Sequence, residues 1–135
     1  MLPQILSKEK FDDFVAFLMT DRRVAAPVAK GPGFAFAIID SADDVGRIRL
    51  DYDITILPPK KYIMPQYETL LEFSGRSPTG VQQSVKARPT VILGVHPYDL
   101  HGLACTDSAM CAQPQDANYS ARRAVTQIIG MNICS

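Results

Sequence analysis

Apolar residues near the start of the chain recur with the period of a helix. Phe11, Phe14, Val15 and Leu18 stand at positions i, i+3, i+4 and i+7 of one stretch. In a helix this spacing places all four side chains on one face. The pattern predicts a helix over residues 8–19 that packs its apolar stripe against the rest of the domain.

Two apolar stretches, residues 24–30 and 34–40, follow this helix and are joined by Gly31-Pro32-Gly33. Glycine and proline between two strand-like segments are typical of a tight turn. The second stretch is apolar at successive positions, which indicates a strand covered on both faces. We therefore expect a β-hairpin here.

The middle of the chain combines short apolar patterns with prolines. Residues 46–50 alternate polar and apolar side chains, which predicts a half-exposed strand. Pro58-Pro59 excludes a helix at that point and indicates a stiff, exposed arm. Pro65 suits the first position of a helix, which we expect to continue to residue 73. The polar stretch 74–86 is then expected to be a long surface loop.

The clearest buried strand is the apolar run 90–95, which ends at His96-Pro97. A helix is expected to start there and to carry Leu100, Leu103 and Ala104 inward. A second helix over 116–123 and an apolar strand over 125–133 complete a β-α-β-like unit. The sequence therefore predicts a single mixed α/β (α+β) domain over residues 1–135. In it, an N-terminal helix and hairpin precede the β-α-β-like unit.

Composition narrows the classes of function. The 135 residues carry 14 Lys plus Arg and 14 Asp plus Glu, so the basic excess of a nucleic-acid binder is absent. No apolar run approaches the ~18 residues of a membrane span, and the first residues do not have the pattern of a signal peptide. We expect a soluble, cytoplasmic protein without membrane insertion. Residues 54–88 hold five basic and two acidic side chains; they either face an anionic ligand or form an ordinary solvated surface.

The three cysteines, Cys105, Cys111 and Cys134, do not form a disulfide framework or a C-x-x-C motif. On one helix, Cys105 and Cys111 are separated by about 9 Å of rise, which is too far for a disulfide. We expect both of them to be small buried apolar residues. Cys134 differs because it is the penultimate residue.

Candidate chemistry gathers at the end of the 90–95 strand, in Gly94, His96, Tyr98 and Asp99. Ligands of open α/β sheets collect at the carboxyl ends of strands, beside helix N-termini. Asp99 has an alternative role as a helix cap, and His96 has one as a structural histidine. His101 is five residues on, which is not the spacing of a shared metal site. No nucleophile–base pair is recognisable, so an enzyme that acts alone is not expected.

Four segments resemble, in order, the ferredoxin-type beta subunit of hydrogenase and sulfur reductase complexes, and also a related iron–sulfur subunit of anaerobic sulfite reductase. The matching segments are VAAPV at 24–28, LDY with PPKKYIMPQYE at 50–68, GVHPYDL with TD at 94–107, and YSARR with NIC at 119–134.

The resemblance implies electron transfer in anaerobic metabolism. Such subunits carry 4Fe-4S clusters and pass electrons between a flavin-bearing partner and a catalytic metal subunit. Family members are longer and carry C-x-x-C-x-x-C motifs further along. The chain is therefore expected to be the N-terminal part of a longer iron–sulfur subunit, where it forms an accessory, cofactor-positioning domain of an oxidoreductase complex. Its expected partners are the other subunits of that complex, not a nucleic acid.

Two departures from the family pattern limit what this chain is expected to hold. His96 replaces an arginine and Tyr98 replaces a cysteine, so Cys134 alone matches a family cysteine as a candidate cluster ligand. Because a 4Fe-4S cluster normally takes four cysteines, we predict that this chain is cluster-free. Lys60 and Lys61 are expected to meet an anionic cofactor or partner. The alternative is a ligand-binding or structural docking module without a redox role.

Overall fold

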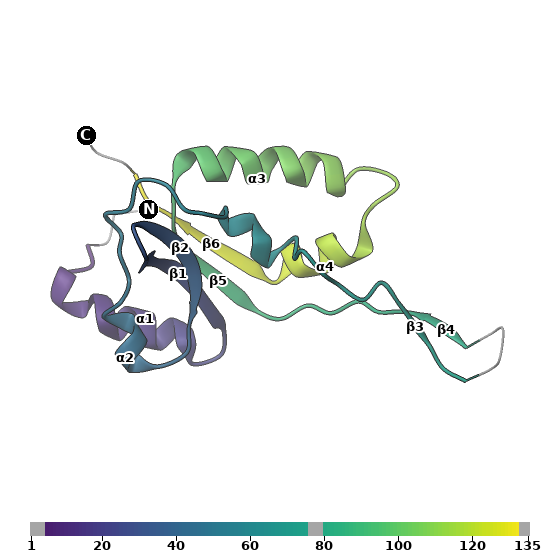
Figure 1. Ribbon diagram of the computed structural model, residues 1–135, viewed down its shortest axis with the longest axis horizontal. Coiled ribbons are helices and arrows are strands. Elements are labelled where there is room, and N and C mark those ends of the chain that lie inside the picture. The colour runs from purple at the N-terminus through teal and green to yellow at the C-terminus, as the bar shows by residue number, and fades with distance from the viewer. Residues whose placement is uncertain (1–4, 76–79, 133–135) are drawn as a thin grey trace.

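The computed structural model describes residues 5–75 and 80–132. Its centre is a four-stranded sheet of order β2-β1-β5-β6 (Figure 1). The strands are β1 (Arg23–Lys30), β2 (Gly33–Ile39), β5 (Thr90–Val95) and β6 (Thr126–Gly130). β1 and β2 are antiparallel, whereas β1, β5 and β6 run parallel to one another. The structure confirms a single mixed α/β fold.

The predicted hairpin is confirmed, with Lys30 opposite Gly33 at its turn. Gly31 has φ +57°, a left-handed conformation that glycine adopts without steric cost. The predicted 90–95 strand is also confirmed, and all six of its residues are buried.

Helices cover both faces of the sheet (Figure 1). On one face lie η1 (Lys8–Lys10), α1 (Phe11–Met19) and α2 (Ala42–Val45), and Val15 and Leu18 enter the core there as predicted. On the other face lie α3 (Pro97–Met110) and α4 (Ala117–Ala124). This arrangement confirms the β-α-β-like unit, because β5, α3, α4 and the parallel strand β6 follow in order. Within α3, Leu103 is buried but Ala104 is exposed, contrary to expectation.

The expected strand over 46–50 is wrong. Within this stretch Ile48 makes one isolated bridge, to Val28, and Arg49 N–H donates to the Pro27 carbonyl. Pro58-Pro59 also differs from the expected exposed arm, because Pro59 is buried and begins the 3₁₀ helix η2 (Pro59–Tyr62). A proline fits this first position since no N–H is needed there.

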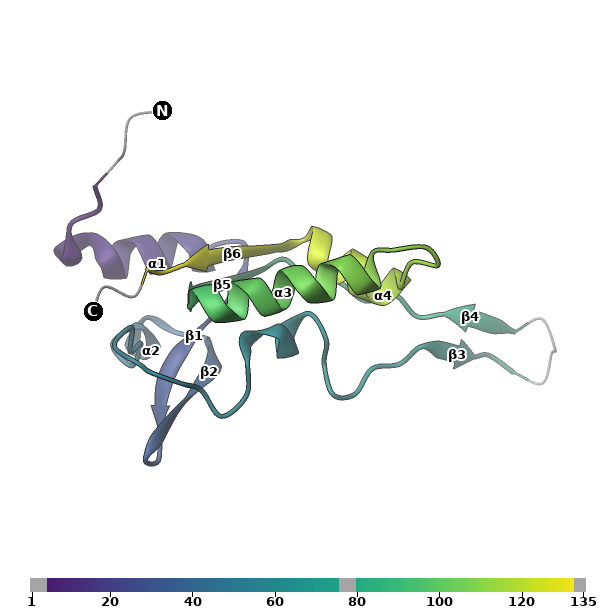
Figure 2. The same cartoon turned by 90° about the horizontal axis from the view of Figure 1, so that it is seen from above.

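The expected helix over 65–73 is also wrong. β3 (Leu71–Phe73) pairs with β4 (Val81–Gln83) in a two-stranded arm that projects from the domain (Figure 2). The apolar side chains of this stretch have no core surface to bury against, and a short helix gains most of its stability from such burial. The expected 74–86 loop therefore contains a strand, and residues 76–79 lie outside the described part of the chain.

Candidate functional site

The end of β5 brings the predicted site residues together. β5 stops at Val95, and Pro97 takes the first position of α3. His96 lies between them with an extended backbone (φ −71°, ψ 155°), and its side chain is buried, with 2% exposed. This location is the carboxyl end of a central parallel strand beside a helix N-terminus, as the sequence predicts.

Aromatic rings surround the His96 imidazole. The Tyr52 ring stacks on it, with centroids 4.0 Å apart and an angle of 12° between the planes. The Tyr98 ring meets it edge to face at 5.3 Å. Sequence reasoning did not include Tyr52 in the site, although the residue belongs to the LDY segment of the family resemblance. Its hydroxyl donates to the Gly94 carbonyl at 2.9 Å, and burial raises the pKa of Tyr52 well above its usual range.

Hydrogen bonds determine which ring nitrogen of a neutral His96 carries the proton. The Tyr98 hydroxyl donates to the Asp53 carbonyl at 2.8 Å. His96 Nδ1 is 3.0 Å from the same hydroxyl oxygen, which has no second proton to give. Nδ1–H is therefore the donor, and Nε2 of the neutral ring is an acceptor. Nε2 is buried and has no hydrogen-bond partner among the described residues.

Gly94 permits a close packing contact rather than an open ligand path. It has φ +79°, and a Cβ added there would lie 2.8 Å from Leu50 Cδ2. The position therefore requires glycine for two reasons: its φ is positive, and a side chain would collide with Leu50. Leu50 fills the volume that a ligand approaching Gly94 would need.

Asp99 and Lys60 form the charged margin of this site. Asp99 is half-buried in the first turn of α3, and burial raises the pKa of its carboxyl group while His96 and Lys60 oppose the increase. The lysines are adjacent in sequence but diverge in space. Lys61 Nζ donates to the Phe36 carbonyl at 2.6 Å and lines a different cleft, described below. Burial, with a smaller effect of Lys30, lowers the pKa of Lys61.

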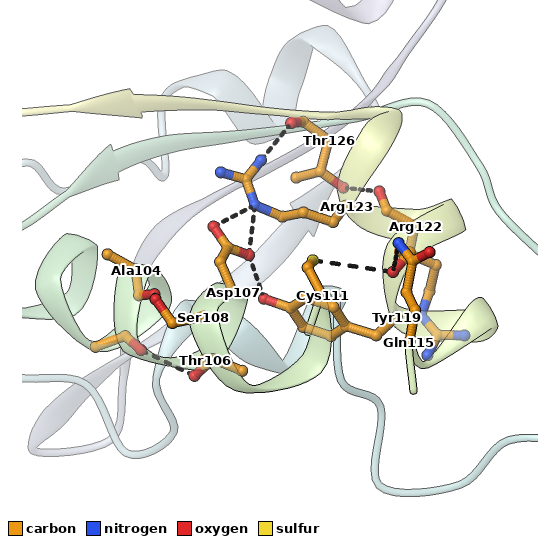
Figure 3. A network of polar contacts seen from close by, with 12 residues as sticks. Ala104, Thr106, Asp107, Ser108, Cys111, Gln115, Tyr119, Arg122, Arg123 and Thr126 are labelled. Carbon is orange, nitrogen blue, oxygen red and sulfur yellow. Dashed lines mark hydrogen bonds and ion pairs between the residues drawn. The ribbon is translucent and has the colours of Figure 1, made fainter. Parts of the chain in front are cut away.

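A second polar cluster ties α3 to α4 and β6 (Figure 3). The Asp107 carboxylate accepts from the Tyr119 hydroxyl at 2.5 Å and from Arg123 Nε at 3.0 Å. Tyr119 is fully buried, and burial, reinforced by Asp107, raises its pKa well above the usual range. Arg123 also reaches the Thr126 carbonyl.

Arg122 joins this region to the PPKKYIMPQYE segment. Its Nε donates to the Ile63 carbonyl at 2.6 Å, and a terminal nitrogen pairs with Glu68 at 2.7 Å. Residues of three resemblance segments, around Ile63, Asp107 and Tyr119, are therefore in contact. The observed contacts join α3 to α4, and α4 to the segment that contains Ile63 and Glu68.

The cysteines lie differently from expectation. Cys105 and Cys111 are exposed, so the prediction that they are buried is wrong. α3 turns Leu103 into the core, which leaves Cys105 on the outer surface, and Cys111 caps the end of the helix. The candidate ligand Cys134 lies outside the described residues. Within residues 5–75 and 80–132, no group of three His, Cys, Asp or Glu side chains is arranged to hold a metal ion.

Comparison with known proteins finds a similarity to a sulfhydrogenase subunit. The chain is similar to the Sulfhydrogenase 2 subunit beta of Pyrococcus furiosus, with 32% identity over 127 residues. The match covers 94% of this chain but 36% of the relative, so the chain spans about a third of that protein. It agrees with the hydrogenase part of the resemblance; the sulfite reductase part stays a prediction.

No family model and no solved structure matches the chain. None of the helices in the described residues is long and apolar enough to span a membrane. Cytoplasmic localisation stays a prediction.

Proposed function

We propose that this chain is an accessory domain of an electron-transfer subunit in a hydrogenase-type complex, where it docks other subunits and helps to position their cofactors. The observation that carries the proposal is the similarity of nearly the whole chain to a sulfhydrogenase beta subunit. The matched stretch includes His96, Tyr98 and Asp107, whose side chains are hydrogen-bonded within the fold.

The described residues do not fit a 4Fe-4S cluster. Such a cluster normally takes four thiolates, and the sequence has three cysteines. Cys105 lies on α3 and Cys111 lies at the end of that helix. Both are exposed, and they are about 9 Å apart along the helix axis. We therefore assign any cluster to the remainder of a longer parent subunit, and any flavin to a partner. The absence of a cluster from this chain stays a prediction, which an iron assay of the purified chain would test.

The surface beside the site has the composition of a docking face. After Asp53, whose carbonyl receives the Tyr98 hydrogen bond, the extended segment presents Ile54, Ile56 and Leu57 to solvent. Tyr98 is 49% exposed, and the exposed Lys60 lies near Asp99. Adjacent apolar, aromatic and charged side chains are typical of protein interfaces. We assign this face to another subunit of the redox complex.

The test is native purification of the tagged chain from its own source organism. The expected result is co-purification of a hydrogenase-type subunit, with iron in the assembly. Ile56→Asp should reduce the recovery of that partner subunit by about tenfold or more, because docking would bury the new charge. Phe17→Asp, at another exposed apolar position, on α1, is the matched control and should leave recovery unchanged. Equal recovery with both variants would exclude the proposed face.

The alternative function is a ligand-binding or structural docking module without a redox role. The observation that favours it is the shortage of thiolates described above. Metal and flavin analysis of the native assembly separates the two functions. An assembly that contains the chain but no iron and no flavin would establish the alternative and reject electron transfer.

A further inference from the structure

A basic cleft of about 460 Å³ lies at the opposite end of the sheet from His96. Arg23 and Thr126, the first residues of β1 and β6, form part of its wall. The charged side chains that line it are five cations and one carboxylate: Arg23, Lys61, Lys86, Arg88, Arg122 and Glu68. The five cations come from four separate segments of the chain, so the fold itself gathers the positive charge.

Three of the cations are held in place by the protein. Lys61 donates to the Phe36 carbonyl, Arg122 donates to the Ile63 carbonyl, and Arg23 donates to Thr90 Oγ1 at 3.2 Å. Arg23 Nε is buried without a hydrogen-bond partner among the described residues, so the protein does not satisfy this guanidinium completely. Cations fixed in this way lose little side-chain freedom when an anion binds.

Protein carboxylates neutralise only part of the charge. Glu68 pairs with Arg122, and Glu72, which is not in the cleft wall, pairs with Lys86 at 3.0 Å. The Lys86 pair is more than half exposed on both sides, and such pairs are weak. Arg88 has no carboxylate within ion-pair distance in the described part of the chain. The cleft therefore keeps a net positive charge.

Two tyrosines add flat surfaces to the cleft. Arg23 and Lys61 lie over the Tyr62 ring, 5.7 Å and 5.1 Å from its centroid. The Tyr67 ring is 92% exposed at the rim. An exposed aromatic ring beside guanidinium groups can stack on the planar part of a ligand whose anionic part meets the cations.

We infer that this cleft binds a small phosphate-bearing molecule with a planar ring, of the mononucleotide class. Guanidinium groups match phosphate oxygens in paired hydrogen bonds. The volume falls within the range of small-molecule sites. The inference does not depend on the proposed redox role, because the cleft and the Ile54–Leu57 face lie at different ends of the sheet.

The test is calorimetric titration of the 135-residue chain with AMP, ribose 5-phosphate and adenosine at low ionic strength. AMP should bind most tightly, ribose 5-phosphate more weakly, and adenosine should not bind measurably. Raising NaCl to 0.5 M should weaken AMP binding, because salt screens exposed charges. The Lys86→Ala/Arg88→Ala variant should lose at least about tenfold in AMP affinity, since hydrogen bonds to charged groups are removed.

The matched control is Lys8→Ala/Lys10→Ala, which removes two exposed lysines from η1. It changes the net charge equally and should keep the wild-type AMP affinity. All positions changed are exposed, and the circular dichroism melting curve checks that each variant is folded. Equal losses in both double variants would show a non-specific charge effect. Absence of AMP binding, or binding of an acidic peptide in its place, would overturn the inference.

Discussion

His96 Nδ1 lies 3.0 Å from the Tyr98 hydroxyl, and that hydroxyl donates its proton to the Asp53 carbonyl. This short chain of hydrogen bonds links the end of β5 to a segment more than forty residues earlier. It also fixes the orientation of a buried imidazole beneath the proposed docking face.

Tyr98→Phe should remove this support for His96. The buried Nδ1–H would lose its acceptor, which costs about 1–3 kcal/mol in free energy of unfolding. ¹⁵N NMR of the imidazoles at neutral pH should show the Nδ1–H tautomer for His96 in the wild type. That preference should be lost in the variant, while the exposed His101 is unchanged and serves as the internal reference. A wild-type His96 with its proton on Nε2 would contradict the assignment.

The site at the end of β5 could be predicted from the sequence, but the side chains from other segments that surround it could not. Residues 91–95 form an uninterrupted apolar run between Thr90 and His96-Pro97, and that pattern alone places Gly94, His96, Tyr98 and Asp99 together. Tyr52 could not be assigned in the same way, because it lies in an extended segment without periodicity. Its position depends on a stacking contact between distant parts of the chain.

The directions of the Lys60 and Lys61 side chains could not be predicted from the sequence either. Lys60 and Lys61 are neighbours in sequence, yet the 3₁₀ turn of η2 sends one toward Asp99 and the other to the basic cleft. The expected 65–73 helix failed for a related reason. An apolar stripe predicts burial only if a complementary surface exists, and the fold supplies none for Leu70 and Leu71.

Asp107→Asn should destabilise the helical layer by about 2 kcal/mol. The substitution weakens two charge-assisted hydrogen bonds, from buried Tyr119 and from Arg123. Urea unfolding measures the change. Asp51→Asn is the control, because the Asp51–Arg49 pair is exposed on both sides, and such solvent-screened pairs contribute little to stability. Similar losses of stability in the two variants would show that the hydrogen bonds of Asp107 contribute no more than an exposed ion pair.

Two glycine substitutions should have opposite effects on stability. Gly94→Ala forces a side chain into φ +79° and a 2.8 Å contact with Leu50 Cδ2, which should cost about 1–3 kcal/mol. Gly102→Ala lies within α3, where the new Cβ would meet no atom within 4 Å apart from its chain neighbours and the backbone of the helix itself, and it should stabilise by about 0.5–1 kcal/mol. Thermal unfolding compares the two. The double variant Gly94→Ala/Leu50→Ala should not recover wild-type stability, since the backbone strain persists.

Alkaline pH should destabilise the protein partly through Tyr62. Burial raises the pKa of its hydroxyl to about 12, while Arg23 opposes the increase. A tyrosine normally has a pKa of about 10, so the unfolded chain releases this proton first. The stabilising contribution of the neutral hydroxyl is complete below pH ~10 and is lost as the pH rises toward 12. Urea unfolding at several values from pH 9 to 12 should therefore show a less steep decline for Tyr62→Phe than for the wild type. The exposed Tyr67→Phe variant should follow the wild-type decline; identical slopes for Tyr62→Phe and wild type would contradict the predicted burial effect.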